Sequence, residues 1–249
     1  MKIALISDIH GNAVALEAVL EDIHSRGADQ VAVLGDICFR GPEPKRALEM
    51  VQALADEHDA KVIKGNVDEW TVRPVRAGEI PEQFIEGFNR EREWCVSQLS
   101  QEDLDWLAAL PHDLQLSLGE NLTLYAFHAT PNSLFDVVWP DASADQIAAT
   151  LLQNRSDQLV AYGHIHYPYI RVVQGKTILN TGSVGLPFDG LPLASYIMVE
   201  TDGVTHQTSL IRVPYDVERV AEQYIKGDYP EAELMVQVVR QAKSPFELK

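Results

Sequence analysis

Seven side chains of types that bind metal ions lie just after the ends of five largely apolar segments of the chain. The segments KIALIS, QVAVL, AKVIK, LTLYAF and QLVAY read as buried strands. The side chains that follow them are Asp8, His10, Asp36, Asn66, His128, His164 and His166. In Asp8-x-His10 and His164-x-His166 the spacing of two would let both ligands face one way on an extended chain. The sequence therefore predicts one metal site at one edge of a sheet.

The seven residues together indicate a metal site, whereas most of the individual motifs do not. Gly-Asp and Gly-Asn are ordinary turn sequences, and an isolated Asp-x-His arises by chance. The pair His164 and His166 is more telling, because two imidazoles at this spacing after a strand have few packing uses. We expect the remaining histidines to be solvated or packed; they are His24, His58, His112 and His206.

The ligand types indicate the metal and its chemistry. Seven ligands are too many for one tetrahedral ion and suit two ions that share a carboxylate. Nitrogen and oxygen ligands without thiolate favour Mn²⁺, Fe, Zn²⁺ or Co²⁺ over Mg²⁺ or Ca²⁺. Two such ions, roughly 3.5–4 Å apart, clamp a phosphoryl group and convert a bridging water into hydroxide. The predicted chemistry is in-line attack on phosphorus.

Strands and helices must alternate to bring these residues together. Leu16, Val19 and Ile23 recur at helical spacing after the first strand, and Leu48 and Val51 do so after the second. The β-α-β-α-β order implies a largely parallel sheet with functional loops at the carboxyl ends of its strands.

Later segments add helices and hairpins to this unit. Residues 69–112 read as a helical insertion with a capping box from Ser100 to Asp103, and residues 215–249 as a helical tail broken near Gly227. We interpret residues 1–249 as a single domain.

Three hairpins and one helix are expected between the insertion and the tail. The hairpins turn at Gly119–Asn121, at Gln174-Gly175 and at Asp202-Gly203. The helix is expected around residues 143–153.

Bulk composition narrows the class of partner. A formal net charge of −17 over 249 residues argues against binding a nucleic acid polymer, but it permits a small anionic substrate where cations invert the field. No apolar run approaches the roughly 20 residues of a membrane span. Two cysteines, Cys38 and Cys95, form no disulfide framework and favour a reducing cytoplasm. The oligomeric state is not indicated.

In this order the motifs resemble those of the calcineurin-like metallophosphoesterase superfamily. Its motifs D-x-H, G-D, G-N-H-[D/E], H and G-H-x-H match Asp8/His10, Asp36, Asn66/Asp68, His128 and His164/His166. SDIHGN and NTGSVGLP, with Thr181 in place of proline, are similar to segments of its small bacterial phosphodiesterase-like branch. The resemblance implies a four-layer α-β-β-α sandwich.

The resemblance also implies how the ligands divide between two divalent ions. The first ion would be bound by Asp8, His10 and His166. The second would be bound by Asn66, His128 and His164. Asp36 would bridge them. Mn²⁺ is favoured, with Fe, Zn, Co or Ni as alternatives.

The chain departs from the superfamily at Val67, where many members have a histidine that contacts the phosphate or protonates the leaving group. The resemblance gives the reaction chemistry to Asp36, Asn66 and His128. We expect Asp68 to face the same side as Asn66, with Val67 facing away, and to orient a metal ligand or water.

Three further residues are predicted to bind substrate: Asn12, Arg40 and Ser183. Arg40 follows the bridging Asp36, and the forked donors of arginine suit phosphate oxygens, as do those of Arg73 and Arg76. Surface ion pairs explain these arginines equally well.

The sequence thus predicts a dinuclear phosphoesterase acting on a small phosphodiester or nucleotide-like substrate. Two alternatives stay open: a protein phosphatase of the same superfamily, and a non-catalytic scaffold like the retromer subunit of this fold. All seven positions keep ligand-type residues, which favours catalysis over the scaffold.

Overall fold

The first sheet is built around the amino-terminal strand. The computed structural model describes residues 1–120 and 122–248. The strands of this sheet, in spatial order, are β10 (His206–Val213), β9 (Ala194–Thr201), β1 (Lys2–Ile6), β2 (Gln30–Val33) and β3 (Lys61–Val62). β1, β2 and β3 pair in parallel as predicted, but β9 and β10 join antiparallel, so the sheet is mixed rather than largely parallel.

The second sheet contains two of the predicted hairpins. Its strands, in spatial order, are β4 (Asp113–Ser117), β5 (Thr123–Phe127), β6 (Leu159–Tyr162), β8 (Lys176–Asn180) and β7 (Tyr169–Val173). The antiparallel pairs β4–β5 and β7–β8 confirm these hairpins, and the β9–β10 pair in the first sheet confirms the third. Asn121, in the predicted first turn, lies outside the described residues.

The alternation of side chains along the strands builds a core on both faces of the first sheet. Ile3 and Leu5 of β1 join one buried cluster with Leu124 and Ala126 of β5, so the two sheets pack face to face. Ile6, which points the opposite way, belongs to the cluster beneath the helices. Burial on both faces explains why this strand is almost continuously apolar.

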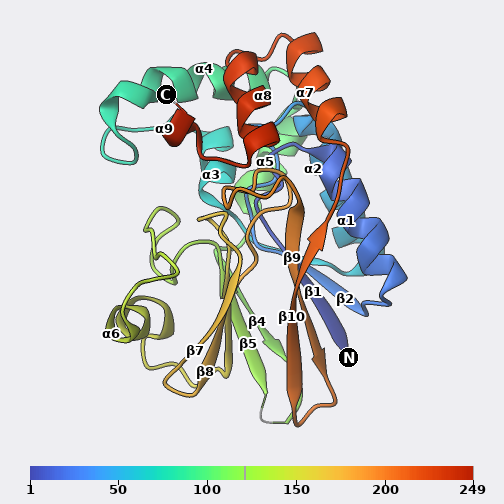
Figure 1. Cartoon of the computed structure of the whole chain (residues 1–249), viewed down its shortest axis with the longest axis vertical. Coiled ribbons are helices and arrows are strands. Elements are labelled where there is room, and N and C mark those ends of the chain that lie inside the picture. Colours follow the sequence, from blue (N-terminus) through green and yellow to red (C-terminus); the bar gives the residue numbers. More distant parts are fainter. Residues whose placement is uncertain (121, 249) are drawn as a thin grey trace.

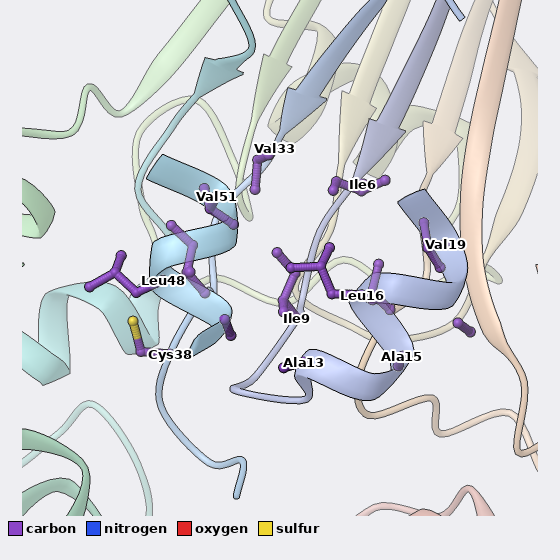
Figure 2. Close-up of a cluster of buried hydrophobic side chains, with 14 of the residues drawn as sticks. Ile6, Ile9, Ala13, Ala15, Leu16, Val19, Val33, Cys38, Leu48 and Val51 are labelled. Carbon is purple, nitrogen blue, oxygen red and sulfur yellow. The ribbon is translucent and has the colours of Figure 1, made fainter. Parts of the chain in front are cut away.

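Helices cover the two outer faces. α1 (Ala13–Ser25) and α2 (Pro44–His58) pack on the first sheet, and Leu16 and Val19 of α1 and Leu48 and Val51 of α2 belong to the same buried cluster as Ile6 (Figure 2). α6 (Ala144–Ile147) and the π-helix that continues it (Ala148–Leu152) cover the second sheet and confirm the helix expected there. Together these layers form the predicted α-β-β-α sandwich.

The remaining helices gather at one end of the sandwich. From the segment 69–112 and its approach come α3 (Asn66–Val72), α4 (Glu82–Val96) and α5 (Gln101–Ala109). From the tail come α7 (Val217–Lys226), α8 (Ala232–Gln241) and α9 (Pro245–Leu248). Both groups lie toward the carboxyl ends of β1 and β2 (Figure 1). The predicted capping box of Ser100 and Asp103 opens α5.

None of the helices in residues 1–120 and 122–248 combines the length and the apolar character needed to cross a bilayer.

Candidate metal centre

Four of the seven predicted ligands meet in one buried cluster. The ligand atoms of Asp8, His10, Asp36 and His166 all lie within 4.8 Å of one another. His166 Nε2 is 3.2 Å from Asp8 Oδ1, and His10 Nε2 is 3.6 Å from Asp36 Oδ2. The loops that follow β1, β2 and β6 supply these side chains. The cluster has the mixed nitrogen and oxygen donors that a divalent transition metal prefers.

The other three predicted ligands form a second group that also adjoins Asp36. Asn66 Oδ1 lies 2.8 Å from both His128 Nε2 and His164 Nδ1. His128 Nε2 is 3.4 Å from Asp36 Oδ2. One carboxylate therefore lies beside both groups, and the structure brings together all seven residues that the sequence singled out.

The hydrogen bonds of the histidine rings indicate which ring nitrogen faces the other candidate ligands. Nδ1 of His10 is 2.9 Å from the carbonyl oxygen of Phe39, and Nδ1 of His166 contacts that of Leu186. A carbonyl only accepts, so in the neutral rings we assign the proton to Nδ1 and a lone pair to Nε2. The two Nε2 atoms are 3.1 Å apart, and two facing lone pairs repel unless a cation lies between them.

The same reasoning applies at His128. Its Nδ1 lies 2.8 Å from the carbonyl oxygen of Leu34, so its Nε2 directs a lone pair at the oxygen atoms of Asn66 and Asp36. Three acceptors facing one another need a proton or a metal ion. Backbone carbonyls that fix the tautomer of a metal-binding histidine are a common feature of such sites.

The pKa values of these groups reflect their burial and the charges of their neighbours. Burial, together with the neighbouring His166, lowers the pKa of His10 to about 4. Burial likewise lowers the pKa of His164 to about 4. Burial also acts to lower the pKa of His128, but the Asp36 carboxylate outweighs it and raises this pKa to about 9. Burial would raise the pKa of Asp8, yet the adjacent His166 and other histidines hold it below its ordinary value.

We expect the metal-free protein to lose stability as the pH rises from about 6.5 to about 9. The pKa of His128 is raised from 6.5 to about 9 on folding, so its protonation stabilises the fold below pH 6.5 and this contribution vanishes above pH 9. The loss should be on the order of 3 kcal/mol. Urea unfolding after chelation measures it, and the slope should be absent from His128→Asn. An equal slope in that variant would contradict the assignment.

Left-handed backbone, rather than strand alternation, turns the ligands toward one another. β1 ends at Ile6 and β6 at Tyr162, so the Asp-x-His and His-x-His motifs lie in loops. Five of the seven residues have positive φ angles: Asp8, His10, Asp36, His164 and His166. Such angles are uncommon outside glycine and cost on the order of 1–3 kcal/mol each. We predicted from strand periodicity that the two ligands of each motif face one way. That reason is wrong, although the Asp-x-His and His-x-His motifs do converge.

The GNVDEW segment opens a helix and is not an extended corner. Asn66 is the first residue of α3, and Val67 lines the cavity described below. Asp68 turns back: Oδ2 accepts from the backbone N–H of Gly65 at 2.9 Å and of Asp36 at 2.7 Å. The prediction that Asn66 and Asp68 share a side while Val67 faces away is therefore wrong, because residues in a helical turn do not alternate. Burial raises the pKa of Asp68 to about 6.

Two of the three predicted substrate-binding side chains, Asn12 and Ser183, form hydrogen bonds that shape the loops of the site. Asn12 Oδ1 accepts from the N–H of Ala15 and so caps α1, while its Nδ2 donates to Gly185 O, each at 3.0 Å. Ser183 Oγ donates to Asp8 O at 2.7 Å. Both residues are buried. Their assignment to substrate stays a prediction, and the contacts give them a role in shaping the loop around Asp8.

Two of the three arginines singled out from the sequence, Arg40 and Arg73, are held in ion pairs. Arg40 lines the cavity, but its Nε lies 3.2 Å from Glu91 Oε2 and its guanidinium lies over Phe88. Arg73 is paired with Glu79 at 2.6 Å, which agrees with the ion-pair interpretation of this residue.

Behind the ligands lies a layer of polar residues that was not predicted from the sequence. Ser7 Oγ donates to the Asp8 carboxylate and lies 2.6 Å from Thr181 Oγ1. Thr181 replaces a proline of the related branch, so that substitution was the one available signal. A hydroxyl at this position joins the chain of hydrogen bonds that orients Asp8.

A cavity of about 460 Å³ opens beside both groups of ligands. Asp36, Asn66, His164 and His166 line one part of it, and aromatic side chains line much of the rest. This volume is typical of small-molecule sites, and a substrate bound there would lie against the candidate metal ligands.

Comparison with known proteins identifies the family. A model described as the calcineurin-like phosphoesterase superfamily domain matches residues 1–204. The uncharacterized protein MJ0912 of Methanocaldococcus jannaschii is 29% identical over 250 residues, which cover 92% of this chain and 94% of that protein.

Solved structures agree with this result. A metallophosphoesterase from Sphaerobacter thermophilus is similar with a TM-score of 0.76 and 27% identity, covering 97% of this chain and 99% of that one. The hypothetical protein PH1004 from Pyrococcus horikoshii OT3 has the same fold, with a TM-score of 0.82 and 23% identity over 96% and 97% of the two chains. The family match spans most of the sequence and includes every candidate ligand, so the chain belongs to the calcineurin-like phosphoesterase superfamily and is a metal-dependent phosphoesterase.

Proposed function

We propose that this protein hydrolyses phosphodiester or nucleotide-like substrates with two divalent metal ions. One ion would be held by Asp8, His10 and His166. The other would be held by Asn66, His128 and His164. Asp36 would bind both. The observation that carries the proposal is the convergence of acceptor atoms in two groups around one carboxylate, with His10 Nε2 3.1 Å from His166 Nε2 and His128 Nε2 2.8 Å from Asn66 Oδ1.

Bound ions would neutralise the phosphoryl oxygens and lower the pKa of the attacking water. The chain's own residues hold the geometry for this chemistry. Asp68 fixes the turn of Asp36 through the backbone N–H groups of Asp36 and Ile37, at 2.7 and 2.9 Å. Ser7 fixes the Asp8 carboxylate. Orientation by such supporting hydrogen bonds is worth 10–100-fold in affinity or activity in comparable sites, which is why we give Asp68 a positioning role.

Val67 limits which esters react quickly. It lines the cavity next to Asn66, where a histidine could have protonated the departing oxygen. Valine has no proton to give, and general acid catalysis is worth about 10²–10⁴-fold. We therefore expect esters with good leaving groups to be preferred.

The proposal also specifies the metal ion, the class of substrate and the cellular compartment. Mn²⁺ is favoured by the histidine, carboxylate and amide donors without thiolate. A charge of −17 supports a small phosphate ester over a nucleic acid polymer. Cys38 and Cys95 are both free and buried, which fits a reducing cytoplasm.

A metal-reconstituted substrate panel tests the proposal. We expect the chelated protein to be inactive, and Mn²⁺ to restore hydrolysis of bis(p-nitrophenyl) phosphate with two ions bound per chain. His164→Ala should lower kcat/KM by about 10²-fold or more, because it removes a ligand. The exposed His112→Ala serves as its control. Full activity of His164→Ala, or of the chelated protein, would disprove the mechanism, and faster hydrolysis of phosphopeptides would favour the protein phosphatase instead.

A further inference from the structure

We propose that the cavity beside the metal ligands binds the organic part of the substrate, and that this part carries an uncharged aromatic ring. The inference rests on the proposed function and specifies its substrate class: a phosphate ester with one phosphoryl group for the metal centre and one flat ring for the cavity.

One wall of the cavity is a fixed aromatic surface. The Trp70 ring stacks on Phe135, with centroids 5.5 Å apart and planes inclined by 30°, and meets Phe88 edge-on at 5.9 Å. Trp70 Nε1 donates to Glu79 Oε2 at 2.9 Å, which fixes the orientation of the indole. All of these residues line the cavity. Offset and edge-to-face contacts with such a wall are how aromatic ligands are held.

Another part of the lining joins the aromatic surface to the metal centre. Phe188 stacks on the ring of His166, with centroids 4.2 Å apart and an angle of 17°. Tyr167 follows His166 and packs edge-on against Trp139 at 5.7 Å. The apolar lining is thus continuous with a metal ligand, so a phosphoryl group at the ions and a ring in the cavity can belong to one molecule.

The rim of the cavity exposes aromatic groups that a ligand would cover. Among the large hydrophobic side chains that the described part of the chain leaves exposed, two are aromatic: Trp139 at 50% and Phe246 at 49%. Both line this cavity, the second from α9 of the tail, which reaches the site from the far end of the sequence. Exposed aromatic surface is unfavourable in water, and its concentration at one cavity marks a binding site.

The charges of the lining disfavour a polyanionic ligand. Among the lining residues within 1–120 and 122–248, Arg40 is the single lysine or arginine, and it is 7% exposed and paired with Glu91. Glu79 and Glu247 also line the cavity. Beyond the metal centre, none of the described residues that line the cavity offers a free cation for a second or third phosphate, so polyphosphates are disfavoured. A cavity of about 460 Å³ suits a nucleoside-sized ring and is too small for a protein segment with its own fold.

Binding of phosphonates, which are not hydrolysed, tests the cavity separately from catalysis. Methyl-, phenyl- and 2-naphthylphosphonate offer the same anion to the Mn²⁺-loaded protein and differ in the ring. We expect Kd by calorimetry to fall at least about tenfold from methyl to phenyl, and further for naphthyl. Trp139→Ala and Phe246→Ala, both at half-exposed positions that tolerate truncation, should each reduce the naphthyl-to-methyl ratio at least about threefold. Ile225→Ala, equally exposed on α7 and away from the cavity, should keep the ratio.

The outcomes separate the two proposals. Equal affinity for the three phosphonates in a protein that hydrolyses phosphodiesters overturns the aromatic site alone. The same conclusion follows if both rim variants keep the full ratio. Binding of the aryl phosphonates with no hydrolysis of any ester overturns the proposed function and leaves the cavity assignment standing. Absence of binding by all three overturns the cavity assignment, and it overturns both proposals if no ester is hydrolysed either.

Discussion

Asp36→Ala is expected to lower kcat/KM for bis(p-nitrophenyl) phosphate by about 10³-fold or more. Oδ2 of this carboxylate lies 3.6 Å from His10 Nε2 and 3.4 Å from His128 Nε2, so its removal affects both groups of ligands at once. Loss of several kcal/mol of transition-state stabilisation corresponds to a change of this size. Steady-state kinetics with Mn²⁺ present, together with the metal content of the purified variant, measures it.

The control for this prediction is another aspartate. Asp105→Ala removes an exposed carboxylate from α5 and should leave both rate and metal content unchanged. If Asp36→Ala kept two bound ions and more than about a tenth of the wild-type rate, Asp36 would not be the residue that joins the two groups.

Gly65→Ala is the second change with a large expected effect. A Cβ at this position would overlap Oδ1 and the backbone nitrogen of Asp36. The φ angle of −102° suits alanine, so the effect is steric and not conformational. We expect a loss of at least about 10²-fold in kcat/KM and about 1–3 kcal/mol of stability, because backbone at a packed site has little room to move. Kinetics and urea unfolding of the same preparation test both effects.

Gly87→Ala is the matched control for the Gly65 substitution. It lies in α4, where an added Cβ meets nothing within 4 Å. Alanine should keep activity and add about 0.5–1 kcal/mol of stability through its higher helix propensity. If Gly65→Ala kept the activity and stability expected of Gly87→Ala, the close approach of Gly65 to Asp36 would not be needed for function.

Local sequence patterns determined much of the fold. The apolar run of KIALI, the helical spacing of Leu16 and Val19 and the turn residues of the three hairpins each depend on near neighbours, so they could be read without tertiary information. The same holds for the Ser100–Asp103 capping box. The candidate ligands could be predicted because parallel strands end at one edge of a sheet, and because the order of the motifs resembles a known family.

Local patterns could not predict the contacts between segments that are distant in the sequence. His10 and His166 are 156 residues apart, and their Nε2 atoms lie 3.1 Å from each other. This approach depends on residues with left-handed backbone, which their residue types did not predict. The side of β1 on which β9 pairs, the turn of Asp68 toward Asp36, and the gathering of Trp70, Trp139 and Phe246 around one cavity likewise required the assembled chain. The sequence by itself determined which side chains could bind metal and which segments carry them. Only the tertiary structure decided what those side chains face, because packing of distant segments, and not local propensity, selects backbone conformations that cost energy in isolation.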